Sequence, residues 1–510
     1  MPSFQAPRGM RDLLPEEAAA FDALEAVIEA RALRYGYPRI VTPIVEDRGV
    51  FTKSVGEASD IVGYEMYDVS LHGQAGLVLR PEGTAAVTRA FLEHGLHRAP
   101  RPVRFFYYEP MFRGQRPQLL RYRQFWQWGL ECFGPEEPLA DVEIVDFTVR
   151  LFSEVGLRNY ELELNTVGDA KCQPKVKAAL AEYFAKNRDA LSDESKGRLE
   201  RNPMRILDSK DPKDRAIVAA APAMHELLCA EDREHFDQVI AGVERLGHPY
   251  KVSQTLVRGL DYYTRTVFEC VLTDPEFTKA GDIAVAGGGR YNDLVQTLGG
   301  PAVQGVGIAG GVDVLYEALK KEGVRVGRDT EADVYVLSAE KADGADRLQI
   351  ADPLRQAGFN VAIDYSDRPL DKQLESAVKH GAKVAVIRGT PEARGGNVIV
   401  RDLVAKTQRV TRLAAVVTEV GRHVPKHQTP PLYEGPPNPN EHEPGAAGEA
   451  PFLKDDREPR RTRPPTRRSG RSATSGCFAS AERSGRDPKG RRTRSSRPVR
   501  WKSRRPRSKY

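Results

Sequence analysis

The first strong pattern of apolar and polar positions lies between residues 15 and 34. Apolar side chains recur there at helical spacing, a proline occupies the first position, acidic residues fill the first turn, and Gly36 follows the last turn. These features predict an amphipathic helix over 15–34. The run 39–45 that follows has the character of a strand, and Pro43 favours an edge position because proline cannot donate to a sheet ladder.

Residues 104–133 hold two aromatic-rich runs on either side of a short basic loop, and this pattern predicts an antiparallel hairpin. Side chains alternate between the two faces of a strand, so every second residue of the run after the loop shares a face. One face carries Arg123, Phe125, Gln127, Gly129 and Glu131, and the other carries Trp126, Trp128 and Leu130. A polar face within a hydrophobic hairpin is costly to bury unless its groups are paired.

The partners of this polar face belong either to the protein or to a ligand. Four arginines between residues 113 and 123 offer guanidinium groups that suit phosphate oxygens, whereas Gln127 and Glu131 suit an amine or an imidazole. The hairpin therefore indicates a phosphate-bearing ligand with an amine or imidazole group. An ordinary ion-paired sheet with a solvated loop explains the hairpin alone equally well.

Three later stretches differ in pattern. Residues 174–247 are rich in helix-forming Ala, Glu, Lys and Arg, which predicts a helical insertion. Residues 333–418 alternate between strand-like and helical segments, which predicts a small α/β domain with a partly parallel sheet. From about residue 425 the chain is dominated by Pro, Gly, Ser and Arg, and this composition is typical of disorder.

Composition agrees with a folded body and adds a charge asymmetry. The 510 residues are 40% hydrophobic and 29% charged, and the formal net charge is +6. Residues 451–510 carry 21 Lys or Arg against 5 Asp or Glu, a net charge of +16, which leaves residues 1–450 at −10. Any polyanion site in the acidic body must therefore come from a local cluster of basic side chains. The tail has three readings: nonspecific RNA affinity, an inert appendage or a coding artefact.

The cysteines form no C-x-x-C pair, which argues against a zinc ribbon, a redox dithiol or a disulfide framework and fits a reducing cytosol. They are Cys132, Cys172, Cys229, Cys270 and Cys477. No apolar run reaches the ~18 residues of a membrane span, and charged residues interrupt the N-terminal stretch before an apolar signal region could form. We therefore expect a cytoplasmic protein without a signal peptide or a membrane segment.

Several further motifs join the hairpin. They are the heptapeptide Arg-Gly-Leu-Asp-Tyr-Tyr-Thr at 258–264, Gly-Gly-Gly-Arg-Tyr at 287–291, and the segments 7–15, 79–84 and 205–210. Together these residues closely resemble the histidyl-tRNA synthetase family of class II aminoacyl-tRNA synthetases, from about residue 5 to about residue 420. The resemblance implies an α+β fold with an antiparallel catalytic sheet flanked by helices.

The same resemblance implies the domain organisation. A class II catalytic core would occupy 1–330, with the helical insertion at about 174–247. An anticodon-binding α/β domain would follow at 331–420, and a disordered Pro/Arg-rich tail at 421–510.

Roles for individual residues also follow from the resemblance, position by position. The histidine substrate would contact Glu82, Gly83, Thr84, Gln127, Glu131, Arg258, Tyr262, Tyr263 and Tyr291. ATP would contact Arg113 at the α-phosphate, Arg121 at the outer phosphates and Phe125 at adenine. Arg258 and Arg113 would be the catalytic cations, because negative charge grows at the α-phosphate during adenylation.

The implied reaction joins histidine to tRNA(His) through histidyl-adenylate and releases AMP and pyrophosphate. ATP with Mg²⁺ is then a substrate complex, and no tightly bound, protein-ligated metal is expected. The segment around Pro43 resembles the motif that builds the dimer interface of class II enzymes, so a homodimer is implied.

The chain departs from the family pattern in one place. Where the family has glutamate and an adenine-stacking arginine, this chain has Asp313 and Val314. This departure favours weaker ATP binding and leaves open a non-catalytic regulatory subunit of ATP phosphoribosyltransferase, a synthetase-like protein of histidine biosynthesis. A plain RNA-binding protein would explain the tail but not the polar hairpin face. The G-x-G-x-x-G at 305–310 follows a loop rather than a buried strand, which argues against NAD binding.

Overall fold

The computed structural model describes residues 4–427, apart from 57, 58, 60, 72, 73, 117, 118, 280–282, 328–330 and 341–343. The predicted disordered tail lies outside the described residues from 428 onward. Among the residues described, no helix combines the length and the apolar character needed to cross a bilayer.

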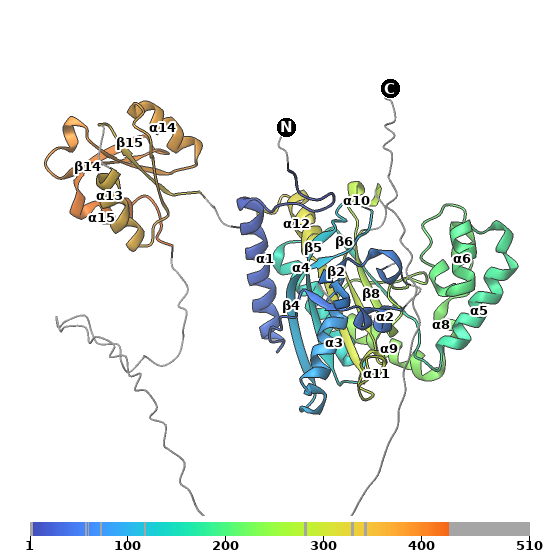
Figure 1. Cartoon of the computed structure of the whole chain (residues 1–510). Coiled ribbons are helices and arrows are strands. Elements are labelled where there is room, and N and C mark those ends of the chain that lie inside the picture. The colour runs from blue at the N-terminus through green and yellow to red at the C-terminus, as the bar shows by residue number, and fades with distance from the viewer. Residues whose placement is uncertain are drawn as a thin grey trace, which may run out of the picture. The chain divides into compact units, whose positions relative to one another are not determined.

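A seven-stranded sheet forms the centre of the part of the chain before residue 328 (Figure 1). Its strands, in spatial order, are β4 (Val103–Phe112), β5 (Gln124–Phe133), β10 (Gly305–Gly311), β9 (Ala284–Arg290), β8 (Thr264–Leu272), β6 (Tyr160–Thr166) and β7 (Lys251–Val252). All neighbouring pairs are antiparallel except β6 and β7. The predicted hairpin is β4 and β5, and the antiparallel catalytic sheet confirms the expected fold class.

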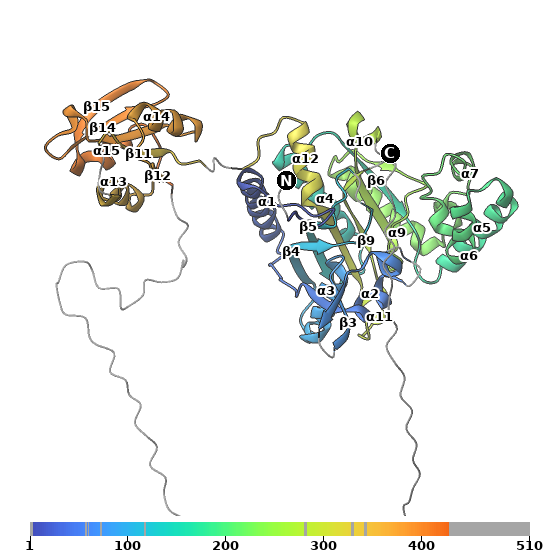
Figure 2. The same ribbon diagram turned by 45° about the horizontal axis from the view of Figure 1, so that its top comes forward.

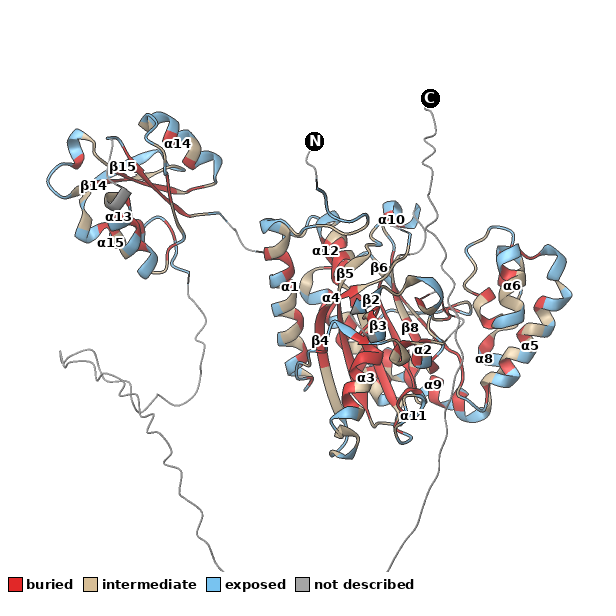
Figure 3. Ribbon diagram, viewed as in Figure 1, coloured by how far each residue is buried: buried red, intermediate tan, exposed pale blue. Residues whose placement is uncertain are grey.

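Long helices cover one face of this sheet. They are α1 (Pro15–Arg34), α4 (Leu139–Val155), α9 (Ala230–Arg245) and α12 (Val312–Lys321). Their apolar sides pack with alternate sheet residues into one core, which includes Phe21 of α1, Trp128 of β5 and Phe147 of α4. Figure 3 shows that much of the seven-stranded sheet under these helices is buried.

The opposite face of the sheet carries the shorter N-terminal elements. A three-stranded sheet of order β1–β3–β2 is built from β1 (Val45–Asp47), β3 (Gln74–Leu79) and β2 (Asp68–Leu71). The helices on this side are α2 (Arg48–Val55), α3 (Thr84–Glu93) and α11 (Leu294–Thr297). The short helix α10 (Pro275–Lys279) follows β8 and packs Phe277 into the core on the first face. Because β5 alternates, Phe125, Gln127 and Glu131 point to the side of α2, α3 and α11, where the candidate site lies.

The helical insertion is shorter than the sequence pattern indicates. It comprises α5 (Gln173–Lys186), α6 (Asp193–Arg201), α7 (Arg215–Ala219) and α8 (Met224–Leu227), which form a group of their own in Figure 2. The last helix of this stretch, α9, instead buries Phe236 and Val239 in the core beneath the sheet. The insertion therefore ends before Ala230, and 230–245 belong to the helical layer that covers the sheet.

The C-terminal domain has a five-stranded sheet of order β12–β11–β13–β14–β15. Its strands are β11 (Val334–Ser338), β12 (Val361–Ile363), β13 (Val384–Arg388), β14 (Asn397–Asp402) and β15 (Thr407–Arg412), with β12, β11 and β13 parallel. Helices α13 (Gly344–Gln356) and α15 (Val416–Val420) pack on one core and α14 (Leu370–Lys379) on another. The partly parallel α/β sheet predicted for this stretch is confirmed.

Candidate active site

Glu131 is the most deeply buried carboxyl group on the polar face of β5. Its side chain has no solvent exposure, and its Oε1 accepts a hydrogen bond of 2.7 Å from the Thr84 hydroxyl. The Tyr291 hydroxyl donates to the other oxygen. Burial raises the pKa of Glu131 to about 8, although these two hydrogen bonds oppose the rise. The carboxyl therefore retains a proton at neutral pH until a partner that stabilises its charge arrives.

The start of α3 places Thr84 opposite this carboxyl. Glu82 accepts hydrogen bonds of 2.8 Å from the backbone N–H groups of Thr84 and Ala85 and so caps the helix. The Gln127 amide oxygen accepts a 3.1 Å bond from Gly83 N–H. Burial raises the pKa of Glu82. Hydrogen bonds thus hold the 82–84 loop against the β5 face.

Three tyrosines form an aromatic wall beside Glu131. The rings of Tyr262 and Tyr263 lie 4.7 Å apart, and Tyr291 meets Tyr262 edge to face at 5.9 Å. All three are buried, and burial raises the pKa of each hydroxyl, which remains a hydrogen-bond donor at neutral pH. The wall therefore combines aromatic faces with hydroxyl groups, and this combination suits a planar ring that bears N–H groups.

Arg258 extends this wall with a fixed cation. Its guanidinium lies 5.8 Å from the centre of the Tyr263 ring and forms an ion pair with Glu269 on β8. Burial by itself lowers the pKa of Arg258, but the facing Glu269 and the neighbouring tyrosines raise it overall. The group stays charged and is held in one place.

Glycines form the floor of the site where the antiparallel neighbours β9 and β10 run beneath it. Gly307 pairs with Glu131 on one side and with Gly289 on the other. A Cβ at Gly307 would collide with the Glu131 carboxyl, and one at Gly287 would collide with the Arg258 guanidinium. Glycine at these two positions leaves room for the Glu131 and Arg258 side chains.

A second basic group lies at the loop end of the hairpin. Arg113 donates through Nε to the Pro81 carbonyl at 2.8 Å and lies 5.1 Å from the centre of the Phe125 ring. Burial lowers the pKa of Arg113. Its remaining N–H groups make it suited to a phosphate next to a ring on Phe125. Arg121, by contrast, is exposed and lies on the loop that leads into β5.

The residues that depart from the family pattern lie at the start of α12. Asp313 is buried and accepts a hydrogen bond of 2.8 Å from the Trp126 backbone N–H. It also forms an ion pair of 3.0 Å with Arg11. Val314 is partly buried against the core. Arg290 does not replace the missing arginine, because it is fully buried in an ion pair with Asp141 and donates to the Pro135 carbonyl at 2.7 Å.

Several supporting residues were not singled out from the sequence. Glu269 pairs with Arg258, and the Tyr107 hydroxyl lies 3.4 Å from the Gln127 amide oxygen. Alternation along β4 could have placed Tyr107 on the site face, since it stands opposite Gly129 in the hairpin. The Arg290–Asp141 pair joins residues 149 apart, and no local pattern indicates it.

The cysteine interpretation needs a correction. The sequence argued against a disulfide framework, but the structure joins Cys172 to Cys229, which are 57 residues apart. The two ends of the insertion meet at this point, so distant cysteines become neighbours without any C-x-x-C spacing. Cys132 and Cys270 are free and buried.

Comparison with known proteins decides the family. A family model described as histidyl-tRNA synthetase matches residues 9–315, and one described as an anticodon binding domain matches residues 333–423. The chain is 41% identical over 416 residues to a histidine–tRNA ligase of Desulforudis audaxviator, covering 82% of this chain and 98% of that protein. This chain belongs to the histidyl-tRNA synthetase family.

Two further relatives agree. A histidine–tRNA ligase of Mycobacterium bovis is 39% identical over 419 residues, covering 82% of this chain and 97% of that protein. The crystal structure of an apo histidyl-tRNA synthetase of S. aureus superposes with a TM-score of 0.68 at 31% identity, covering 82% of this chain and 99% of that one.

Proposed function

We propose that this chain is a histidine–tRNA ligase, which activates histidine with ATP and transfers it to tRNA(His). The observation that carries the proposal is the buried Glu131 carboxyl, held between Thr84 and Tyr291 and bordered by the Tyr262–Tyr263 wall. A carboxyl group in such a pocket recognises a side chain that can take up its proton. Imidazole is such a side chain, because the ion pair that it forms with the carboxylate stabilises both charges.

Histidine would be oriented at both ends. Its imidazole would pair with Glu131, while Tyr263 would donate to the ring and Tyr262 and Tyr291 would enclose it. Its α-amino group would lie near Gln127 and Glu82, with Thr84 and the backbone of Gly83 completing the contacts. The carboxylate of the substrate is then free to face the phosphates.

The adenylation step asks for alignment and charge neutralisation rather than for a protein nucleophile. The histidine carboxylate attacks the ATP α-phosphate in line, and pyrophosphate leaves. Arg113 would hold the α-phosphate, Arg258 would stabilise the charge that grows there, and Phe125 would support adenine. Arg121 would reach the outer phosphates, where Mg²⁺ bound to ATP neutralises charge.

In the second step, a terminal ribose hydroxyl of tRNA(His) would attack the adenylate carbonyl and release AMP. The domain at 333–423 would contact the anticodon. We also propose a homodimer formed around the segment that contains Pro43, and a cytoplasmic location.

Histidine-dependent ATP–pyrophosphate exchange on the purified chain tests the proposal. We expect exchange with histidine and none with other amino acids, followed by charging of tRNA(His). The regulatory-subunit alternative, which Val314 favours, predicts no exchange while histidine still binds.

A further inference from the structure

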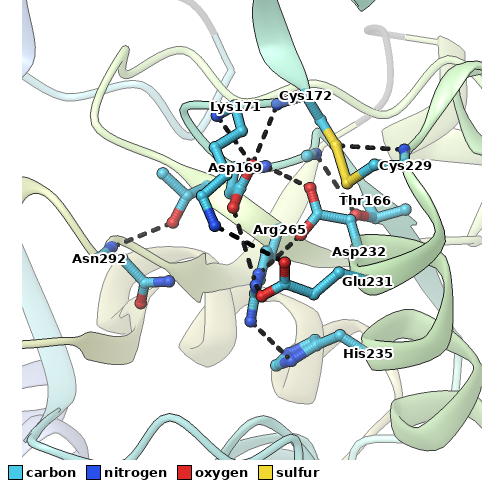
Figure 4. Close-up of polar contacts among 12 residues, drawn as sticks. Thr166, Asp169, Lys171, Cys172, Cys229, Glu231, Asp232, His235, Arg265 and Asn292 are labelled. Atoms are coloured by element: carbon cyan, nitrogen blue, oxygen red, sulfur yellow. Dashed lines mark hydrogen bonds and ion pairs between the residues drawn. A yellow bond between two sulfur atoms is a disulfide. The ribbon is translucent and has the colours of Figure 1, made fainter.

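Two cysteines and two aspartates meet at the neck of the helical insertion (Figure 4). Asp169 and Cys172 lie immediately before α5, and Cys229 and Asp232 lie at the start of α9. Each pair has two residues between its members, and the order of the two types is reversed from one pair to the other. The whole insertion, 173–228, leaves and rejoins the core between them.

The four side chains are close enough to share one small ion. One ligand atom from each residue, a Sγ or a carboxylate oxygen, lies within 4.8 Å of all the others. Cys172 and Asp232 are buried, whereas Asp169 and Cys229 are partly buried. In the structure the two sulfur atoms are joined as a disulfide, which is the oxidised form of the same pair.

The surrounding hydrogen bonds orient these groups. Asp169 Oδ1 accepts from the backbone N–H groups of Lys171 and Cys172 at 2.9 and 3.0 Å. Asp232 accepts from Arg265 Nε at 2.8 Å and from Asp169 N–H at 2.7 Å. The Cys229 N–H donates to Cys172 Sγ at 3.2 Å, a contact that favours a thiolate at this sulfur. Metal-binding carboxylates and thiolates are typically held by outer partners of this kind.

We propose that, in the reduced protein, Asp169, Cys172, Cys229 and Asp232 bind one divalent ion of the zinc class. A thiol reductant first converts the disulfide to two thiols and is itself oxidised to a disulfide. The metal ion then displaces two protons as the thiols become thiolates. Two thiolates select Zn²⁺ over Mg²⁺ or Ca²⁺, which prefer oxygen ligands only. Four ligands from two short segments fit the tetrahedral coordination of structural zinc.

The charges of the cluster support a dication. Two thiolates and two carboxylates would place four negative charges in a confined space, and the neighbouring cation Arg265, which is shared among three carboxylates, satisfies only part of this charge. Arg265 lies 2.8 Å from Asp232, 3.7 Å from Asp169 and 3.0 Å from Glu231. A bound Zn²⁺ would relieve the remaining repulsion in the reduced state.

This metal clip would connect the insertion to the histidine pocket. Arg265 follows Tyr263 by two residues, and the Gln173 amide donates to the Tyr263 carbonyl at 3.0 Å. The ion would close the base of the insertion while the same short segment of chain positions the aromatic wall.

Cobalt titration of the full chain tests the site. The protein is reduced with a phosphine, freed of metal, and titrated with Co²⁺ without oxygen, with the free thiols counted in parallel. We expect one equivalent of Co²⁺ per chain, a thiolate-to-cobalt charge-transfer absorption, and displacement by Zn²⁺. Cys172→Ser should abolish the absorption. Asp232→Asn, which keeps both thiols, should weaken binding by about tenfold or more, and Cys270→Ala should leave it unchanged.

Two results would overturn the proposal. The first is absence of the cobalt absorption from wild-type protein whose thiols are all free, which would make the pair a disulfide only. The second is full Co²⁺ binding by Cys172→Ser or Asp169→Asn, which would place the metal elsewhere. Because Asp169→Asn removes no sulfur and lies at a partly exposed position, it answers the question if the cysteine variant does not fold.

Discussion

Glu131→Gln isolates the group on which histidine recognition is proposed to depend. The substitution keeps the shape of the side chain and an oxygen that can accept from Thr84 or Tyr291, but it removes the ability to ionise. In the wild type, an imidazole can take the proton that burial keeps on the carboxyl, and an ion pair results. The glutamine variant offers only a neutral hydrogen bond.

The expected rise in the histidine KM follows from the strength of a hydrogen bond to a charged group. Hydrogen bonds to charged groups contribute about 1.5–3 kcal/mol, which corresponds to roughly a 10- to 150-fold rise in the histidine KM. The ATP KM should stay unchanged because Arg113 and Phe125, rather than Glu131, are proposed to contact the nucleotide. Glu200→Gln, an exposed change in the insertion, serves as the matched control.

The pH dependence of stability provides an independent test of the raised pKa of the Glu131 carboxyl. Its pKa is about 8 in the folded protein and 4.5 is the ordinary value, so the folded state holds a proton that the unfolded chain loses first. The free energy of unfolding should therefore fall as pH rises from 4.5 to about 8, by at most about 5 kcal/mol. Glu131→Gln removes this fall, and urea unfolding at pH 5 and pH 8 compares the two proteins.

Pyrophosphate exchange for the histidine and ATP KM values, together with the unfolding series, completes the experiment. An unchanged histidine KM would refute the recognition role of Glu131. Equal pH dependence of unfolding in wild type and variant would show that the carboxyl is already ionised in the folded protein.

Three other outcomes are expected. Arg258→Ala should lower the kcat of pyrophosphate exchange by roughly 10²–10³ because its charge acts mainly in the transition state, and a change confined to KM would contradict this. Val314→Arg should tighten ATP several-fold through about 0.5–2 kcal/mol of stacking and cation–π attraction, with the histidine KM unchanged; weaker ATP binding would mean that the site has been rebuilt around valine. Deleting residues 428–510 should flatten the salt dependence of tRNA binding without altering exchange, whereas identical salt slopes would identify the tail as inert.

Local patterns predicted the elements whose information lies in neighbouring residues. The helix at 15–34 and the hairpin follow from spacing alone, and both are present. The strand predicted over 39–45 was wrong except for Val45, because this segment makes only an isolated bridge from Arg39 to Phe106 before β1 begins. Short β-like runs depend on partners that spacing does not specify.

The candidate site divides in the same way. Alternation along β5 placed Gln127 and Glu131 on one face, but the partners of Glu131 are 47 and 160 residues distant in the chain. Only the resemblance to a family brought Thr84 and Tyr291 into the site. The family resemblance did not point to Cys172 and Cys229, which meet where the insertion leaves and rejoins the core. The signal that was missed is the spacing of the two aspartates, each of which is separated from a cysteine by two residues, in opposite order.

The glycine floor has a consequence for how this sheet tolerates mutation. Gly307 and Gly287 contribute no functional group, yet adding one methyl group to either would push against Glu131 or Arg258. A saturation scan scored by growth should therefore find that Gly307 and Gly287 tolerate substitution as poorly as Glu131 and Arg258. Such a scan would locate the proposed substrate pocket through two residues that do not contact the substrate, because the absence of a side chain at these glycines is what keeps Glu131 and Arg258 in place.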